Sequence, residues 1–322
     1  MRALDMHCDT IMKIYLEKGT QLRENSFQLD LKRMKESGTV LQNFAMFVQL
    51  DEVKDSYQRC LAMIDCYHQE MQKNQDLIQP VTTFQQYQEN LAAGKLSGLL
   101  TMEEGAPLAG RVDRLQEFYD LGVRMLTLTW NFENELGFPN SNYFDTKTGK
   151  IATEQQGLTE QGIQIVKKMN ELGIMIDVSH GSDQLVRDVL TYTTRPFVAS
   201  HSNAREVCHH PRNLSDELIK GIANRGGVIG MNYAADFIRP QGTESSLVEG
   251  IVRHIQHFYN VGGIGCIGLG SDFDGIKVHP ELADILSLAK IEKALVQAQF
   301  TTGEIEQIFA GNVERLYREF LV

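Results

Sequence analysis

Short runs of hydrophobic residues, rich in β-branched types, recur along the chain and alternate with longer segments that mix polar and apolar positions. Several of these runs are nearly continuous in hydrophobic residues, as expected for strands of a parallel sheet that is covered on both faces. We therefore predict eight buried strands. They span residues 3–7, 40–47, 98–102, 125–130, 174–178, 196–200, 227–232 and 266–270.

Helical patterns fill most of the segments between these strands, and the clearest covers residues 159–172, with Thr159 as N-cap and Gly173 as the C′ residue. Its predicted apolar stripe consists of Ile163, Val166, Met169 and Leu172. Eight strand–helix alternations predict an α/β protein with a (β/α)8 TIM-type barrel. A doubly wound open sheet is the alternative, but its first turn is usually glycine-rich, whereas here the first strand runs into HCDT.

Two connections are longer than a simple barrel requires. Residues 51–95 contain a helical pattern at 56–73, a break at Pro80 and a second helical pattern at 84–93. Residues 131–158 are polar and rich in Asn, Gly and Thr, which predicts a loop over the mouth of a site. No linker-like composition or repeat divides the chain. We therefore expect one barrel domain over residues 1–322, with insertions at about 51–95 and 131–158.

Composition narrows the classes of function. Hydrophobic residues make up 42% of the chain, and no apolar run reaches the ~18 residues of a membrane span. A formal net charge of −11 and the lack of a basic block argue against a nucleic-acid partner. The five scattered cysteines, without a CxxC pair, and the lack of a signal peptide before the first strand favour reduced thiols and a cytoplasmic location.

Residue types that bind metals lie at the ends of five predicted strands. They are His7 and Asp9, Glu103, His180, His201 and Asp272, at the ends of the first, third, fifth, sixth and eighth strands. Barrel enzymes carry their reacting groups at these strand ends, so the side chains are expected to converge. Imidazoles and carboxylates suit zinc, and Glu103 can use both carboxylate oxygens to bridge two ions about 3.5–4 Å apart. The pattern predicts a hydrolytic two-metal site.

Individual members of this set have alternatives. Asp9 could be the N-cap of the next helix instead of a ligand. Glu104 could bridge the ions in place of its neighbour Glu103, and Asp274 could act in place of Asp272. The joint placement at five strand ends favours the metal site more than any single residue does.

Eight motifs follow one another along the chain: HCDT, MEEG, LTLTWN, GLTEQG, IDVSH, SHSNAREVCHHPRN, GSDFDG and GNVERLY. The motifs extend over almost the whole chain. Their sequences and their order resemble those of the membrane (renal) dipeptidase family, a branch of the metal-dependent amidohydrolase superfamily. The resemblance implies a (β/α)8 barrel with two Zn²⁺ ions that hydrolyses dipeptides, often with a D-residue or an achiral residue at the C-terminal position.

The resemblance also implies roles for single residues. Asp272 matches the catalytic acid/base, and Arg212 matches the arginine that meets the carboxylate of the substrate. Without the resemblance, a surface salt bridge with Asp216 or Glu206 would be the alternative role of Arg212. The matched metal ligands are His7 and Asp9 for one zinc ion, His180 and His201 for the other, and Glu103 between them.

One position departs from the family pattern. In mammalian members the fourth-strand motif reads LTLTH, with its His near the substrate carbonyl, whereas this chain has Trp130 there. An indole N–H can donate one hydrogen bond but carries no charge, so oxyanion stabilisation or substrate preference is expected to differ. Trp130 and the following Asn131 are the further residues expected to contact substrate.

The predicted function is that of a zinc-dependent dipeptidase in which a metal-bridging hydroxide attacks the peptide bond. Two alternatives stay open: another binuclear amidohydrolase, acting on cyclic amides or lactones or as a deaminase, and a non-catalytic metal-binding barrel. The expected partners are a small dipeptide and, as an assembly, a homodimer, without nucleic acid or membrane. Mammalian members are secreted and lipid-anchored, whereas this chain shows neither signal and resembles the bacterial cytoplasmic members.

Overall fold

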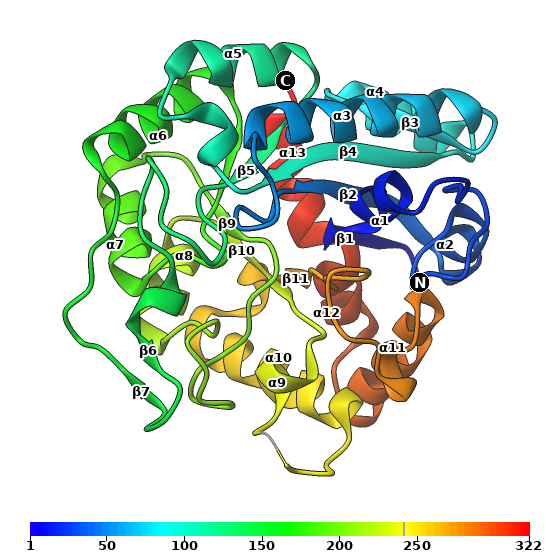
Figure 1. The fold of residues 1–322 in the computed structure, drawn as a ribbon. Helices are drawn as coiled ribbons and strands as arrows, with labels where there is room; N and C mark the ends of the chain where they lie inside the picture. Colours follow the sequence, from blue (N-terminus) through cyan, green and yellow to red (C-terminus); the bar gives the residue numbers. More distant parts are fainter. Residues whose placement is uncertain (241) are drawn as a thin grey trace.

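A closed barrel of eight parallel strands forms the centre of the protein (Figure 1). The barrel strands are β1 (Ala3–Cys8), β2 (Thr39–Phe47), β4 (Leu96–Glu103), β5 (Met125–Thr127), β8 (Met175–Asp177), β9 (Val198–Ala199), β10 (Val228–Met231) and β11 (Ile267–Leu269). β1 pairs with β2 and with β11, and the pairing of β2 with β4 closes the ring. The computed structural model describes residues 1–240 and 242–322. The predicted (β/α)8 barrel is confirmed.

Helices cover the outside of the barrel and one of its ends (Figure 1). They are α1 (Thr10–Leu16), α2 (Leu31–Ser37), α3 (Ser56–Lys73), α4 (Phe84–Ala92), α5 (Val112–Asp120), α6 (Glu160–Leu172), α7 (Asp183–Tyr192), α8 (Asp216–Asn224), α9 (Ala235–Ile238), α10 (Leu247–Gly262), α11 (Leu288–Gln297), α12 (Thr302–Glu306) and α13 (Asn312–Phe320). Within the described residues, no helix combines the length and the apolar character needed to cross a membrane.

Helix α6 shows how local sequence sets these elements. The hydroxyl of Thr159 accepts a hydrogen bond from Gly162 N at 3.0 Å, and Gly173 ends the helix with a left-handed φ of 76°. Both predicted caps are therefore present. The buried face differs from the predicted stripe, because Ile163 and Leu172 are only half-buried. Its fully buried members are Gly162, Ile165, Val166 and Met169.

The predicted strands are present, but several are shorter than the hydrophobic runs. β5 ends at Thr127, although its run continues to Trp130, because the chain turns there. An additional strand, β3 (Ile78–Val81), pairs with the first half of β4 on the edge that β5 occupies further along. Pro80 lies inside this strand instead of breaking it. β3 is paired on one side only, and an edge strand tolerates the missing N–H of proline.

Both long connections contain secondary structure of their own. Residues 51–95 hold α3, β3 and α4. Residues 131–158 hold a short 3-10 helix (Asn140–Tyr143) and the hairpin of β6 (Phe144–Asp145) and β7 (Lys150–Ile151), which projects at the lower left of Figure 1. Asn140 N donates to the carbonyl oxygen of His180 at 2.8 Å, so this connection lies beside a predicted site residue.

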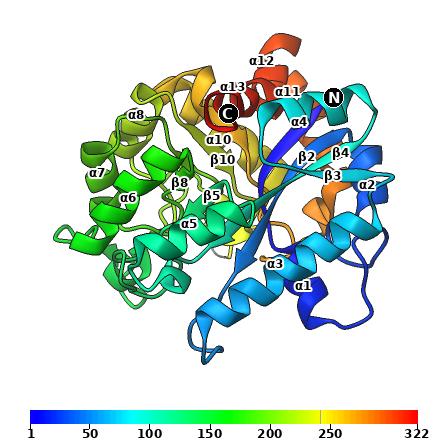
Figure 2. The same cartoon turned by 90° about the horizontal axis from the view of Figure 1, so that it is seen from above.

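One end of the barrel is sealed by the C-terminal helix. α13 lies across the end at which the strands begin (Figure 2). Val313 and Leu316 pack there with buried side chains such as Leu4 and Met125. The hydroxyl of Tyr317 donates to Asn43 Oδ1 inside the barrel at 2.6 Å. The end at which the strands finish is therefore the end that a site can occupy.

Candidate active site

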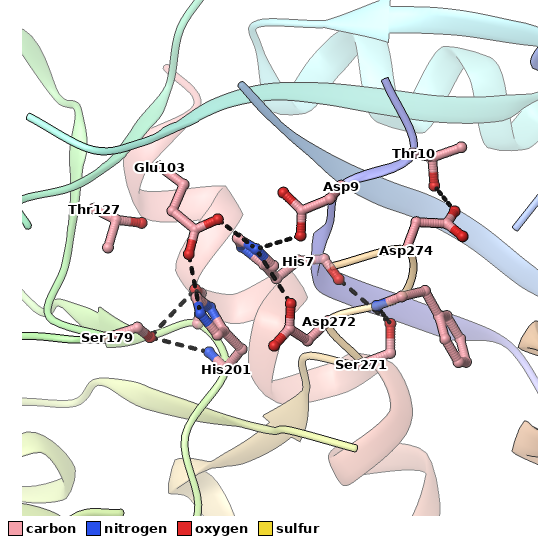
Figure 3. A network of polar contacts seen from close by, with 12 residues as sticks. His7, Asp9, Thr10, Glu103, Thr127, Ser179, His201, Ser271, Asp272 and Asp274 are labelled. Carbon is pink, nitrogen blue, oxygen red and sulfur yellow. Dashed lines mark hydrogen bonds and ion pairs between the residues drawn. The ribbon is translucent and has the colours of Figure 1, made fainter. Parts of the chain in front are cut away.

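Six ionisable side chains from five barrel strands meet at the end where the strands finish. Figure 3 labels all of them except His180. All six are buried, with at most 8% of their surface exposed. They are His7 and Asp9 of β1 and its end, Glu103 at the end of β4, and His180, His201 and Asp272 just after β8, β9 and β11. The structure thus brings together all residues that the sequence placed in the metal site.

Glu103 faces two groups of side chains at once. Its Oε2 lies 3.2 Å from His7 Nε2, and its Oε1 lies 3.1 Å from His180 Nε2 and 3.4 Å from His201 Nε2. On the first side, His7 Nε2 also lies 3.4 Å from Asp9 Oδ2. One carboxylate therefore stands between an imidazole–carboxylate pair and a pair of imidazoles.

Hydrogen bonds fix which nitrogen of two imidazoles carries the proton. His180 Nδ1 lies 2.9 Å from Asn131 Oδ1, which can only accept, so Nδ1 is the donor. His201 Nδ1 lies 2.7 Å from Ser200 Oγ, and this hydroxyl in turn donates to Asp177 Oδ2 at 2.5 Å. Ser200 therefore accepts from His201 Nδ1. In both rings, Nε2 is left with a lone pair that points into the site.

This arrangement fits a bound cation. The lone pairs on His180 Nε2 and His201 Nε2 face each other at 3.0 Å, and both face Glu103. Electron-rich atoms at these distances repel unless a positive charge lies between them. On the other side, His7 Nε2 and Asp9 Oδ1 are buried and make no hydrogen bond, which is costly unless a ligand satisfies them. Imidazole nitrogens with carboxylate oxygens are the donor set of a divalent metal such as zinc.

Burial shapes the charges of the site. It lowers the pKa of His180 to about 4 and also lowers the pKa of His201, so both rings are neutral ligands. Burial, together with the adjacent Glu103, raises the pKa of Asp9 to about 8. It also raises the pKa of Asp272 to about 6. Burial opposes ionisation of Glu103 as well, but the adjacent His7 holds the pKa of this carboxyl well below its usual value. A cation at the site would keep these acids ionised.

Glu103 and Glu104 have different surroundings in the structure. Glu104 has a positive φ of 115°, and its side chain accepts hydrogen bonds from Ala106 N at 2.8 Å and from Trp130 N at 3.0 Å. It also accepts from the side-chain amide of Asn134. Glu104 is therefore occupied by the turn that carries Trp130, whereas Glu103 faces the site.

The side chains of Asp272 and Asp274 also have different surroundings. Asp274 accepts from Thr10 Oγ1 at 2.6 Å and from Gln28 N at 2.8 Å, which ties the loop after β11 to the N-terminal segment. Asp272 instead faces His7, with 3.8 Å between its Oδ1 and His7 Nε2. Its other oxygen accepts from Asn232 Nδ2 at 2.9 Å.

Three residues that support this site were not found from the sequence. Asp177 accepts hydrogen bonds from the backbone N–H groups of Ser179 and Ser200 and from the hydroxyl of Thr127. Through Ser200 it orients His201, and Asn232 orients Asp272. The one available signal was an acidic residue within the buried strand motif IDVSH.

Arg212 lies at the edge of the cluster and is only 6% exposed. It donates to the carbonyl oxygen of His201 at 3.0 Å, and its Nε is buried without a partner. Within the described residues it forms no ion pair with Asp216 or Glu206, so the surface salt bridge is excluded. Arg212 lines a cavity of about 590 Å³ together with Asn131.

A barrel that gathers imidazoles and carboxylates at the ends of its strands has the architecture of a metal-dependent hydrolase. The model of the membrane dipeptidase family (peptidase family M19) matches residues 1–320, and the chain belongs to this family. It is a metal-dependent dipeptidase, a hydrolase of peptide bonds. The family that the motifs indicated is thereby confirmed.

Similar proteins support this assignment. An uncharacterised dipeptidase of Schizosaccharomyces pombe is 29% identical over 342 residues, which cover 99% of this chain and 80% of that protein. The crystal structure of a dipeptidase of family M19 matches with a TM-score of 0.92 and 26% identity, covering 100% of this chain and 99% of the other. A metallopeptidase from Rhodobacter sphaeroides, liganded with a phosphinate mimic of the dipeptide L-Ala-D-Ala, matches with a TM-score of 0.91 and 25% identity over 99% of both chains.

Proposed function

We propose that this dipeptidase uses two zinc ions and cleaves dipeptides that carry a free C-terminal carboxylate, including those with a D-residue at that position. The observation that carries the two-ion proposal is the position of Glu103, whose two oxygens face separate groups of ligands at 3.1–3.4 Å. The relative from Rhodobacter sphaeroides, liganded with a mimic of L-Ala-D-Ala, supports the proposal for the D-residue.

The proposed ligands follow from the two groups. His7 and Asp9 would hold one ion, His180 and His201 would hold the other, and Glu103 would belong to both ligand sets. When bound, such ions would supply polarisation of a peptide carbonyl and a lowered pKa of water.

Asp272 is the proposed proton carrier. One of its oxygens is held by Asn232, whereas the other faces the ligand cluster. This placement leaves one oxygen free to exchange a proton with a group bound at the cluster. Asp272 takes the proton from the attacking water and passes it to the nitrogen of the leaving amine.

Arg212 is the proposed anchor of the substrate. The buried Nε of this guanidinium has no hydrogen-bond partner in the protein, and a C-terminal carboxylate could accept from it. The anchor places that carboxylate within one residue of the cleaved bond. This arrangement restricts the substrate to dipeptides.

Replacement of Arg212 by Ala is expected to raise KM for a dipeptide by about 10²-fold, since a lost charged hydrogen bond costs ~2–3 kcal/mol. Steady-state kinetics with a dipeptide and its C-terminal amide provide the measurement. The amide should already be a poor substrate of the wild type and should lose little more in the variant. Equal turnover of acid and amide by the wild type would refute the carboxylate anchor, whatever the variant does.

Replacement of Ser200 by Ala is expected to weaken metal binding by about 10–100-fold, the usual effect of losing a hydrogen bond behind a metal ligand. The change removes the hydroxyl that keeps His201 Nε2 directed into the site. Titration of the apoprotein against a competing chelator gives the affinity. Ser37→Ala is the control, because the Ser37 hydroxyl contacts Met34 O and Thr39 far from the site. Unchanged affinity in Ser200→Ala would contradict the positioning role.

A further inference from the structure

The space around the ligand cluster is divided into two compartments. The larger one, of about 590 Å³, is lined by Arg212. The smaller one, of about 180 Å³, reaches the ligand cluster at Asp9, Glu103 and Asp272. The two compartments share three lining residues, Asn131, His180 and Phe237. A substrate at the cluster can therefore extend into both.

The smaller compartment has an apolar wall that the mechanism does not use. This wall is formed by Met12, Phe47, Trp130 and Ile276. All four side chains are only partly buried, so they present apolar surface to the compartment. Partly exposed apolar side chains gathered beside a reaction centre mark a surface for an apolar ligand group.

We propose that this compartment receives the side chain of the N-terminal residue of the dipeptide and selects apolar side chains. The inference rests on the proposed anchoring of the C-terminal carboxylate by Arg212. With the carboxylate in the larger compartment and the peptide carbonyl at the ligand cluster, the N-terminal residue continues beyond the cluster. The compartment that opens there is the smaller one.

The apolar wall is held in place before substrate binds. The Trp130 ring packs edge-on against Phe47, with 4.8 Å between ring centroids and an angle of 61°. The ring of Phe132 also lies near the indole, with 5.8 Å between ring centroids. The backbone N–H of Trp130 donates to the buried Glu104. A preformed wall gains from apolar contact without a cost for ordering its own side chains.

The charge and the volume of the smaller compartment limit which N-terminal side chains it can accept. Among the described residues that line the smaller compartment, none is Lys or Arg, so an acidic side chain finds no cationic side chain to pair with. The volume of about 180 Å³ lies below the ~300 Å³ at which pockets accept drug-sized ligands. Part of this space adjoins Asp9, Glu103 and Asp272, where the cleaved bond would lie, and the part beside the apolar wall suits a single aliphatic side chain such as that of Leu or Met.

The test is a series of dipeptides that differ only in the N-terminal residue. The metal-loaded enzyme is assayed on Gly-, Leu-, Met-, Asp- and Lys-Ala, with the Ala isomer that it hydrolyses faster. We expect kcat/KM for Leu and Met to exceed that for Gly by about 10–100-fold, and Asp to fall below Gly. Equal values for Leu, Gly and Asp would overturn the inference and leave the dipeptidase activity intact. Failure to hydrolyse any member would instead overturn the proposed function.

Two variants locate the preference on the wall. Phe47→Ser and Trp130→His are each expected to lower the Leu-to-Gly ratio of kcat/KM by about 10-fold, because each removes apolar contact area. Val296→Ser is the control, since Val296 on α11 is 57% exposed away from the site. Thermal unfolding checks that each variant is folded. If both wall variants fold and keep the wild-type ratio, the wall does not select the substrate.

Discussion

The variant Asp272→Asn is expected to lower kcat by about 10²–10⁴-fold while the protein keeps its fold and its metal ions. This is the range for losing a general acid/base. An amide still offers one oxygen to Asn232, so the side chain can keep its place. It can no longer accept the proton of the attacking water or pass it to the leaving amine. Steady-state kinetics, with metal analysis of the same preparation, provide the measurement.

Asp274→Asn is the matched control, since it makes the same change two residues away. Asp274 is tied to Thr10 and Gln28 and does not face the cluster, so its substitution is expected to change kcat by less than about tenfold. Near-normal turnover in Asp272→Asn, or a larger loss in Asp274→Asn, would show that the proton carrier has been misassigned.

The variant Glu103→Gln is expected to weaken metal binding on both sides of the site, by more than the ~10–100-fold that an outer-shell substitution costs. An amide has one oxygen instead of two. Its NH2 group has no lone pair available to bind a cation and would occupy the position of the second oxygen. Activity should fall with the metal content. Metal analysis after gel filtration and kinetics at saturating metal separate lost binding from lost chemistry.

Glu104→Gln supplies the control for that experiment. It should retain the metal ions but lower the free energy of unfolding by about 1–3 kcal/mol, because a buried acceptor of three hydrogen bonds is replaced by a group that also donates. The opposite ranking, with metal lost in Glu104→Gln and retained in Glu103→Gln, would show that the wrong glutamate has been chosen.

Much of the fold could be predicted because buried parallel strands leave a strong pattern. The continuous apolar runs and the caps of α6 depend on local sequence alone, and both are present in the structure. The position of β3 could not be predicted, because Pro80 normally argues against a strand. It is tolerated only at an edge, and an edge is a property of the assembled sheet. The early end of β5 likewise depends on the turn that Glu104 holds.

The metal-binding residue types of the site could also be predicted from the sequence. His7, Glu103 and His201 each lie at or just after the end of a strand, so barrel geometry alone predicts that they converge. The choice between Glu103 and Glu104 could not be made, because it depends on the positive φ at Glu104. Asp177 and Ser200 could not be predicted, because they act by orienting His201 and show no metal-binding pattern of their own.

The two-ion proposal is tested most directly by measuring how many divalent ions per chain full activity requires. The apoprotein is titrated with zinc, and bound metal and turnover of a dipeptide are measured at each step. The position of Glu103 between two groups of ligands predicts that activity reaches its maximum only as the second ion binds. Full activity with one bound ion, or with none, would contradict it.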